Sequence, residues 1–194
     1  MTEATILSPR FSPLQLQDRA IGWQIFAVIA GTALLTLSSY ITVPMVPVPM
    51  TMQTFAVTLI GALYGWRLGA FTIIAWLIEG ASGLPVLAGG SAGLVHFFGP
   101  TGGYLFAFPV TGAVVGWLAE RGWNANRVVM AFFAMLIGNA LCLVLGGAWL
   151  AVMIGTGPAI TAGVTPFILG GVLKSVLGAA TLKALDRGTA KPAA

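Results

Sequence analysis

Three long stretches of this chain are almost free of charged residues, and they limit the folds that the sequence can adopt. Residues 20–66 contain no charged side chain, residues 68–119 contain only Glu79, and residues 128–182 contain only Lys174. A helix needs about 20 apolar residues to cross a bilayer, so each stretch is long enough for two such helices and a turn. Charged residues make up 7% of the chain, against about 25% in soluble proteins. The sequence therefore predicts an all-helical integral membrane protein.

Residues typical of turns lie near the middle of each stretch. They are three prolines between residues 44 and 49, a glycine-rich loop over residues 83–103, and Gly155-Thr156-Gly157-Pro158. We therefore expect six transmembrane helices in three hairpins, over residues 22–40, 51–64, 68–84, 103–119, 128–150 and 162–185. The second and third helices are shorter than a full crossing, which is expected where helix ends line a cavity inside the protein.

Basic residues predict how the helices are oriented. Lys and Arg lie in both tails and in the second and fourth links between helices, whereas the other three links have none. Since cytoplasmic segments of membrane proteins carry the excess of Lys and Arg, we expect both termini on the cytoplasmic side. The basic residues are too scattered to form a nucleic-acid site, and the expected surroundings are membrane lipid. The predicted domains are a cytoplasmic tail over residues 1–19 with a short surface helix near residues 14–19, a membrane domain over residues 20–187, and a cytoplasmic tail over residues 188–194.

Three polar residues inside the predicted spans are candidates for a functional site. A charge within a span costs at least about 2.5–3.5 kcal/mol on insertion scales, and by default it indicates such a site. Glu79 and Lys174 are expected at matching depth in the outer half of the membrane. There they either face one cavity or form a buried ion pair that only joins two helices. Asn139, in the fifth span, either ties helices together or contacts a ligand.

Enzyme motifs are weak in this sequence. Gly80-Ala81-Ser82-Gly83 matches the G-x-S-G pattern of intramembrane serine proteases, which need a histidine base beside the serine. The single histidine, His96, lies in the predicted outer loop instead of on a later helix. The sequence also lacks a cluster of residues with metal-ligand spacing and a phosphate-binding loop. The chain is thus predicted to be no enzyme and to hold no metal, and a hydrolase that uses Ser82 is the alternative from another class.

Four short motifs stand in order along most of the chain. They are residues 48–54 (VPMTMQT), residues 83–86 (GLPV), residues 99–104 (GPTGGY), and Pro166-Phe167 followed by Lys174. Together they resemble the BioY family, the biotin-binding S components of energy-coupling factor (ECF) vitamin transporters. The resemblance implies a six-helix S-component bundle in the bacterial cytoplasmic membrane, which captures biotin from outside with high affinity for uptake and uses no cofactor. An S component for another small vitamin is the alternative within this class.

The resemblance also implies partners. S components dock through an A-x-x-x-A pattern in the first helix on a membrane T component, which is linked to two cytosolic ATPases. Ala27 and Gly31 are the candidates for this docking surface, since they keep small residues four positions apart.

Biotin fits the polar residues named above. Its carboxylate needs a cation in a region of low dielectric constant, and Lys174 is the candidate. Its ureido ring has two N–H donors and one carbonyl acceptor, which backbone groups of the glycine-rich loop or the side chains of Asn139, Thr51 or Gln53 are expected to meet. Tyr104 or a tryptophan is expected to supply an apolar wall.

One position departs from the family pattern. The family usually has an acidic residue three positions before the lysine, where this chain has Gly171. We hypothesise that Glu79 replaces this acid from the third helix and pairs with Lys174.

Overall fold

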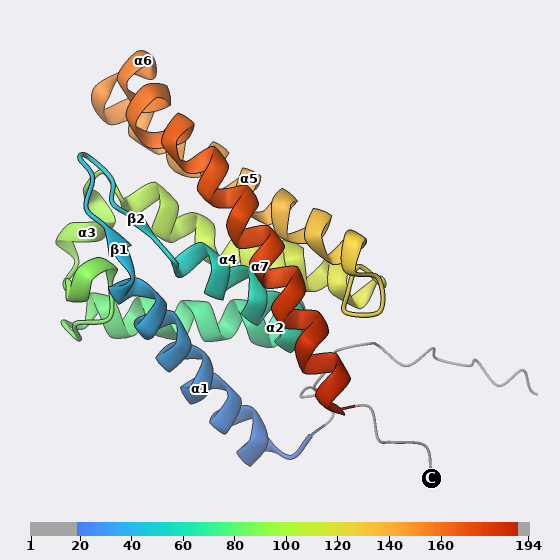
Figure 1. Cartoon of the computed structure of the whole chain (residues 1–194). Coiled ribbons are helices and arrows are strands. Elements are labelled where there is room, and N and C mark those ends of the chain that lie inside the picture. The colour runs from blue at the N-terminus through green and yellow to red at the C-terminus, as the bar shows by residue number, and fades with distance from the viewer. Residues whose placement is uncertain (1–18, 190–194) are drawn as a thin grey trace, which may run out of the picture.

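Long apolar helices make up most of the chain, and they pack side by side as a bundle (Figure 1). The computed structural model describes residues 19–189. Five of its helical segments are long and apolar enough to cross a membrane. They are α1 (Ile21–Tyr40), α2 (Gln53–Ala81), α4 (Gly102–Glu120), α5 (Val128–Ile154), and α7 (Thr165–Thr189) together with α6 (Thr156–Pro158) and the π-helical segment Ala159–Val164. The predicted all-helical membrane fold is confirmed.

Helix α2 contains the break that the sequence predicts between the second and third helices. Gly65 has φ 78° and ψ 175°, which is not helical and is a conformation that only glycine adopts readily. The two arms of α2 diverge from this corner (Figure 1) and touch close to it. A Cβ atom built on Gly69 would lie 3.1 Å from the Cα atom of Gly61. The N–H of Trp66, which begins the second arm, donates to Glu120 Oε1 at 3.2 Å and links the corner to the end of α4.

A short β-hairpin joins α1 to α2, where the sequence predicts a turn and a helix starting at residue 51. Strands β1 (Thr42–Val43) and β2 (Met50–Thr51) pair antiparallel, with Thr42 opposite Thr51. Helix α2 begins only at Gln53. The prolines between the strands have no N–H to donate and disfavour a helical conformation in the residue before them, so they favour extended chain here.

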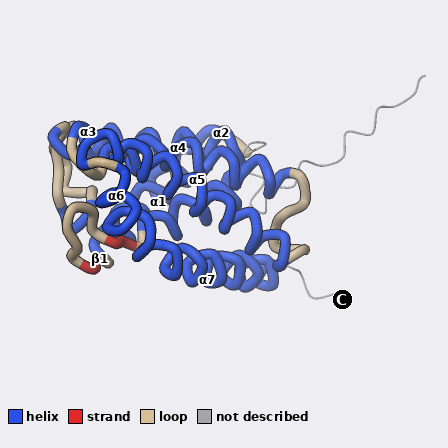
Figure 2. Tube along the Cα trace, turned by 90° about the horizontal axis from the view of Figure 1, so that it is seen from above, coloured by secondary structure: helices blue, strands red, loops and turns tan. Residues whose placement is uncertain are grey.

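The glycine-rich loop lies between α2 and α4 and contains two short helical turns, Ala88–Gly90 and α3 (Val95–Phe98). Side chains from two long helices hold the loop. Ser39 Oγ donates to the carbonyl oxygen of Leu87 at 3.0 Å, and Tyr40 Oη donates to that of Pro85 at 2.8 Å. From α5, Trp149 Nε1 donates to the carbonyl oxygen of Gly99 at 3.1 Å. Figure 2 shows α3, β1 and α6 gathered at the same end of the bundle.

Helices α1 and α2 pack against each other through the residues that the sequence offers for partner docking. Ala27 is 5% exposed, and its carbonyl oxygen accepts a hydrogen bond from Tyr64 Oη at 2.9 Å. A Cβ atom on Gly31 would lie 3.1 Å from the Tyr64 ring, so Gly31 is also covered. The chain itself therefore occupies the predicted docking surface, because the small residues allow the ring of Tyr64 to approach α1.

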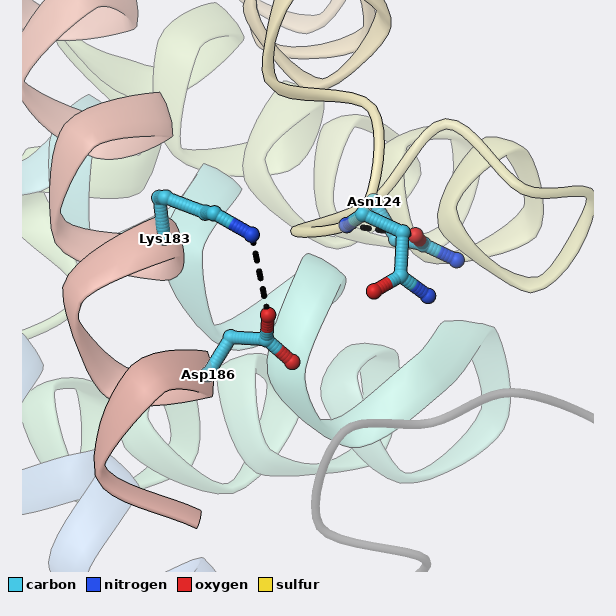
Figure 3. Close-up of polar contacts among 4 residues, drawn as sticks. Asn124, Lys183 and Asp186 are labelled. Atoms are coloured by element: carbon cyan, nitrogen blue, oxygen red, sulfur yellow. Dashed lines mark hydrogen bonds and ion pairs between the residues drawn. The ribbon is translucent and has the colours of Figure 1, made fainter. Parts of the chain in front are cut away.

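The basic residues named below lie at or near the breaks and ends of helices. Arg67 follows the Gly65 corner, Arg121 and Arg127 flank the turn between α4 and α5, and Lys183 lies near the end of α7. Lys183 pairs with Asp186 at 3.2 Å (Figure 3). In the turn, Asn124 Nδ2 donates to the carbonyl oxygen of Ala119 at 3.1 Å and caps α4. Most of the predicted surface helix near residues 14–19 lies outside the described residues.

Candidate functional site

A cavity of about 210 Å³ lies beneath the glycine-rich loop. Its wall combines the hairpin, the loop and helices α2, α4, α5 and α7, which are far apart in the sequence. The residues that line it are Val48, Pro49, Thr51, Gln53, Thr54, Leu87, Ala88, Ser91, His96, Thr101, Tyr104, Leu105, Phe108, Asn139, Cys142, Leu143, Phe167, Gly171 and Lys174. Five of the six side chains that the sequence predicts for the site are in this wall; Glu79 is not.

Lys174 is the one Lys or Arg among the described residues that line the cavity. It projects from α7, is 9% exposed, and donates from Nζ to Thr54 Oγ1 at 3.3 Å. Removing an ammonium group from water costs several kcal/mol unless a charge or strong hydrogen bonds compensate. Within residues 19–189, the structure has no ion pair at Lys174. The cavity therefore offers a buried positive charge whose remaining N–H donors suit an anionic group.

Glu79 does not provide the missing negative charge. It is half-buried in the second arm of α2 and belongs neither to the cavity wall nor to an ion pair among the described residues. The sequence predicts that Glu79 and Lys174 lie at the same depth in the membrane. Depth alone, however, does not determine the direction in which a helical side chain points. The structure thus does not bring the hypothesised Glu79–Lys174 pair together.

Asn139 is held in a fixed orientation by α5 and α7. Its Nδ2 atom donates to the carbonyl oxygen of Met135 at 3.0 Å and to Ser175 Oγ at 3.1 Å. The Ser175 hydroxyl in turn donates to the carbonyl oxygen of Gly171 at 2.8 Å. Asn139 therefore ties the two helices together, which is one of the two alternatives that the sequence left open. It also lines the cavity, and the ligand contact stays a prediction.

Gln53 and Thr51 form the polar part of the wall where β2 meets α2. Thr51 Oγ1 donates to Gln53 Oε1 at 2.8 Å, and the backbone N–H of Gln53 donates to Thr51 Oγ1 at 3.3 Å. Gln53 Nε2 is buried and has no hydrogen-bond acceptor among the described residues. A buried donor without a partner costs about 1–3 kcal/mol, so this amide group is suited to a ligand or a water molecule that accepts a hydrogen bond.

Tyr104 forms an aromatic part of the wall with Phe167. Their rings stack with centroids 6.3 Å apart and planes 26° apart. Tyr104 Oη donates to the carbonyl oxygen of Gly163 at 2.7 Å, within the π-helical segment before α7. The ring also packs on Gly146 of α5, where a Cβ atom would overlap it. Since its hydroxyl is already bonded, Tyr104 presents mainly an apolar face.

The glycine-rich loop contributes a second polar group of residues, which the sequence did not predict. Ser91, His96 and Thr101 line the cavity from this side. His96 was considered only as a catalytic base, although a single histidine in such an apolar chain is itself a signal of a polar site. The hydrogen bonds from Ser39 and Tyr40 to the loop carbonyls hold the loop to α1, and this contact between distant segments could not be predicted from spacing.

The serine of the G-x-S-G motif is not part of the cavity. Ser82 is exposed, and its hydroxyl donates to the carbonyl oxygen of Ile78 at 2.7 Å. No hydrogen bond joins Ser82 to His96 in the described part of the chain, and the two residues do not form a catalytic pair.

Comparison with known proteins gives the family. A sequence model of the BioY family matches residues 13–191, which is nearly the whole chain. The chain belongs to the BioY family. The predicted family membership is therefore confirmed.

Two named relatives and one solved structure support membership in this family. The chain is 35% identical over 117 residues to the biotin transporter BioY2 of Lactococcus lactis, an alignment that covers 60% of this chain and 63% of the relative. It is 41% identical over 90 residues to the biotin transporter BioY of Thermotoga maritima, covering 46% of this chain and 53% of the relative. The alignments thus span about half to three-fifths of these BioY relatives.

The fold is similar to that of the S-component for biotin from an ECF-type ABC transporter, known from a crystal structure. The TM-score is 0.72 at 25% sequence identity, and the match covers 84% of this chain and 90% of the other.

Proposed function

We propose that this chain is the biotin-binding S component of an ECF-type transporter, and that it captures biotin for uptake across the cytoplasmic membrane. The observation that carries the proposal is the buried cation of Lys174 in a largely apolar cavity, beneath a loop held by two helices. A small apolar molecule with one carboxylate matches such a cavity, because low dielectric constant strengthens the attraction between the two charges. The BioY relatives, which are named as biotin transporters, support biotin as this molecule.

Each chemical part of biotin has a counterpart in the wall. The carboxylate pairs with Lys174, whose ammonium group is positioned by Thr54. The ureido ring needs both acceptors and donors, which Asn139 and Gln53 supply. The apolar ring and chain pack against Tyr104 and the neighbouring apolar residues. Glu79 is not included in this site.

The orientation is part of the same proposal. We infer six membrane crossings, with the two arms of α2 counted separately, and both termini in the cytoplasm. The basic residues at the Gly65 corner, at the α4–α5 turn and near the end of α7 support this orientation by the positive-inside rule. The glycine-rich loop and the hairpin then face the outside, so biotin enters the cavity from there.

Calorimetric titration of biotin into the detergent-purified chain, without any partner, tests the proposal. We expect tight binding with one biotin per chain, since every polar group named above comes from this chain alone. Titrations with other small vitamins serve as controls and are expected to give no signal. Absence of biotin binding, or tighter binding of another vitamin, would contradict the proposed ligand.

Docking on a membrane T component with two cytosolic ATPases completes the proposed function. Because Ala27 and Gly31 are covered by α2, a partner would contact an exposed face of α1, which includes Ala30 and Ala33. We expect Ala30→Trp to prevent co-purification with the T component and to leave biotin binding by the isolated chain unchanged. Val144→Trp, at an exposed position of α5, is the control. Normal co-purification of the Ala30→Trp variant would exclude this face.

A further inference from the structure

Two arginine–tryptophan pairs lie where the Gly65 corner of α2 meets the end of α4. The Cζ atom of Arg67 lies 4.9 Å from the centre of the Trp66 ring, and the Cζ atom of Arg121 lies 3.5 Å from the centre of the Trp117 ring. All four side chains are exposed. A cation–π attraction holds each guanidinium group over its ring, so both positive charges have a defined position at the surface.

The backbone segments that carry the two pairs touch each other. The N–H of Trp66 donates to Glu120 Oε1 at 3.2 Å, and a Cβ atom on Gly116 would overlap the same nitrogen atom. Trp117 follows Gly116 directly, and Arg121 follows Glu120. The two pairs therefore lie together, and we call them the Arg–Trp cluster, which consists of Trp66, Arg67, Trp117 and Arg121.

The Arg–Trp cluster has a net positive charge. Glu120 brings one carboxylate to this corner, against two guanidinium groups, and neither arginine forms an ion pair within residues 19–189. A guanidinium group is a planar fork of N–H donors that matches two oxygens of a phosphate with parallel hydrogen bonds. Arg121 Nη1 donates to the carbonyl oxygen of Trp117 at 3.5 Å, which leaves the other N–H groups of this arginine available. The cluster therefore suits a phosphate group that carries a negative charge.

The surroundings of the cluster indicate where such a phosphate group comes from. Tryptophan side chains at the ends of membrane spans lie at the level of the lipid headgroups. Large apolar side chains are exposed on the same two helices further into the spans, among them Phe71 on α2 and Val110 on α4. A ligand at this corner thus meets cations at one end and an apolar surface at the other, which matches the headgroup and the acyl chains of a phospholipid.

We propose that the Arg–Trp cluster binds the headgroup of an anionic phospholipid, with the phosphate on the two arginines and the acyl chains along α2 and α4. The net positive charge favours phosphatidylglycerol over phosphatidylcholine, whose choline group places a cation beside the phosphate. In the proposed orientation the cluster lies in the cytoplasmic leaflet, where anionic lipids attract basic residues. The inference goes beyond biotin capture and includes no residue of the cavity wall.

Native mass spectrometry of the detergent-purified chain, incubated with equal amounts of phosphatidylglycerol and phosphatidylcholine that have the same acyl chains, tests the proposal. Each arginine near an anionic lipid contributes about a fivefold preference. We therefore expect the wild-type chain to retain phosphatidylglycerol over phosphatidylcholine by about tenfold or more. Arg67→Gln and Arg121→Gln should each lower this ratio about fivefold, and the double variant should retain the two lipids about equally.

Lys183→Gln is the matched control, because it removes a positive charge that pairs with Asp186, and its lipid preference should equal that of the wild type. The double variant should unfold at the wild-type temperature, since both arginines are exposed. A wild-type preference in the double variant, or no preference in the wild type, would overturn the proposal. Release of phosphatidylglycerol by excess glycerol phosphate would also overturn it, because the cluster would then bind a free phosphate group. The measurement needs no biotin, so its outcome is independent of the proposed ligand.

Discussion

Lys174→Ala should weaken the binding of biotin by about 10- to 100-fold and the binding of biotin amide much less. A hydrogen bond to a charged group contributes about 1.5–3 kcal/mol, which corresponds to that range of affinity. In the cavity the ammonium group has Thr54 Oγ1 as its protein partner at 3.3 Å and no carboxylate among the described residues. Most of its compensation must therefore come from the carboxylate of the ligand. Calorimetric titration of both ligands into both proteins measures the difference.

Lys183→Ala is the control for this prediction. Lys183 is also on α7, but its ammonium group pairs with Asp186 and its side chain is 32% exposed. A partly exposed ion pair of this kind contributes only about 0–1 kcal/mol to stability. Lys183 is not among the residues that line the cavity, so biotin affinity should not change. If Lys174→Ala lowered the affinities for biotin and biotin amide equally, the carboxylate would not be the partner of Lys174.

The sequence was sufficient to find five of the side chains that line the cavity, for a physical reason. In a chain with so few polar groups inside its spans, each of them must be bonded or face a cavity, and Lys174 and Asn139 do both. The family motifs over residues 48–54 and 99–104 predicted Thr51, Gln53 and Tyr104 as site residues, and these residues also line the cavity. Turn residues likewise located the breaks within the uncharged stretches, and the charge of Arg67 between two stretches located the break at Gly65.

The remaining features depend on which way a side chain points and on contacts between distant segments. Glu79 lies on α2 but outside the cavity wall, because its position along the helix does not determine the direction in which its side chain points. Ala27 and Gly31 show the small-residue pattern of a helix contact, but the pattern does not say whether the contact is with another protein or with α2. His96 lines the cavity only because the glycine-rich loop folds over the cavity.

Gly61→Ala should clearly destabilise the helix bundle. A Cβ atom at this position would overlap the backbone carbonyl oxygen of Gly112 on α4, and no change of rotamer can relieve an overlap with backbone. Gly116, one turn further along α4, is close to the backbone of the Gly65 corner in the same way, so the two helices meet along glycines. Overpacking of a core typically costs about 1–3 kcal/mol. We expect a clear fall in the unfolding temperature for Gly61→Ala and no fall for Gly22→Ala. Tryptophan fluorescence in detergent measures both unfolding temperatures.

Gly61→Ala should affect ligand binding as well as stability. The first arm of α2 begins at Gln53 and also carries Thr54, both in the cavity wall, so moving α2 away from α4 should lower biotin affinity together with stability. Gly22→Ala is the control, because a Cβ atom there meets nothing within 4 Å. Equal unfolding temperatures for Gly61→Ala and Gly22→Ala would contradict the close approach of α2 and α4.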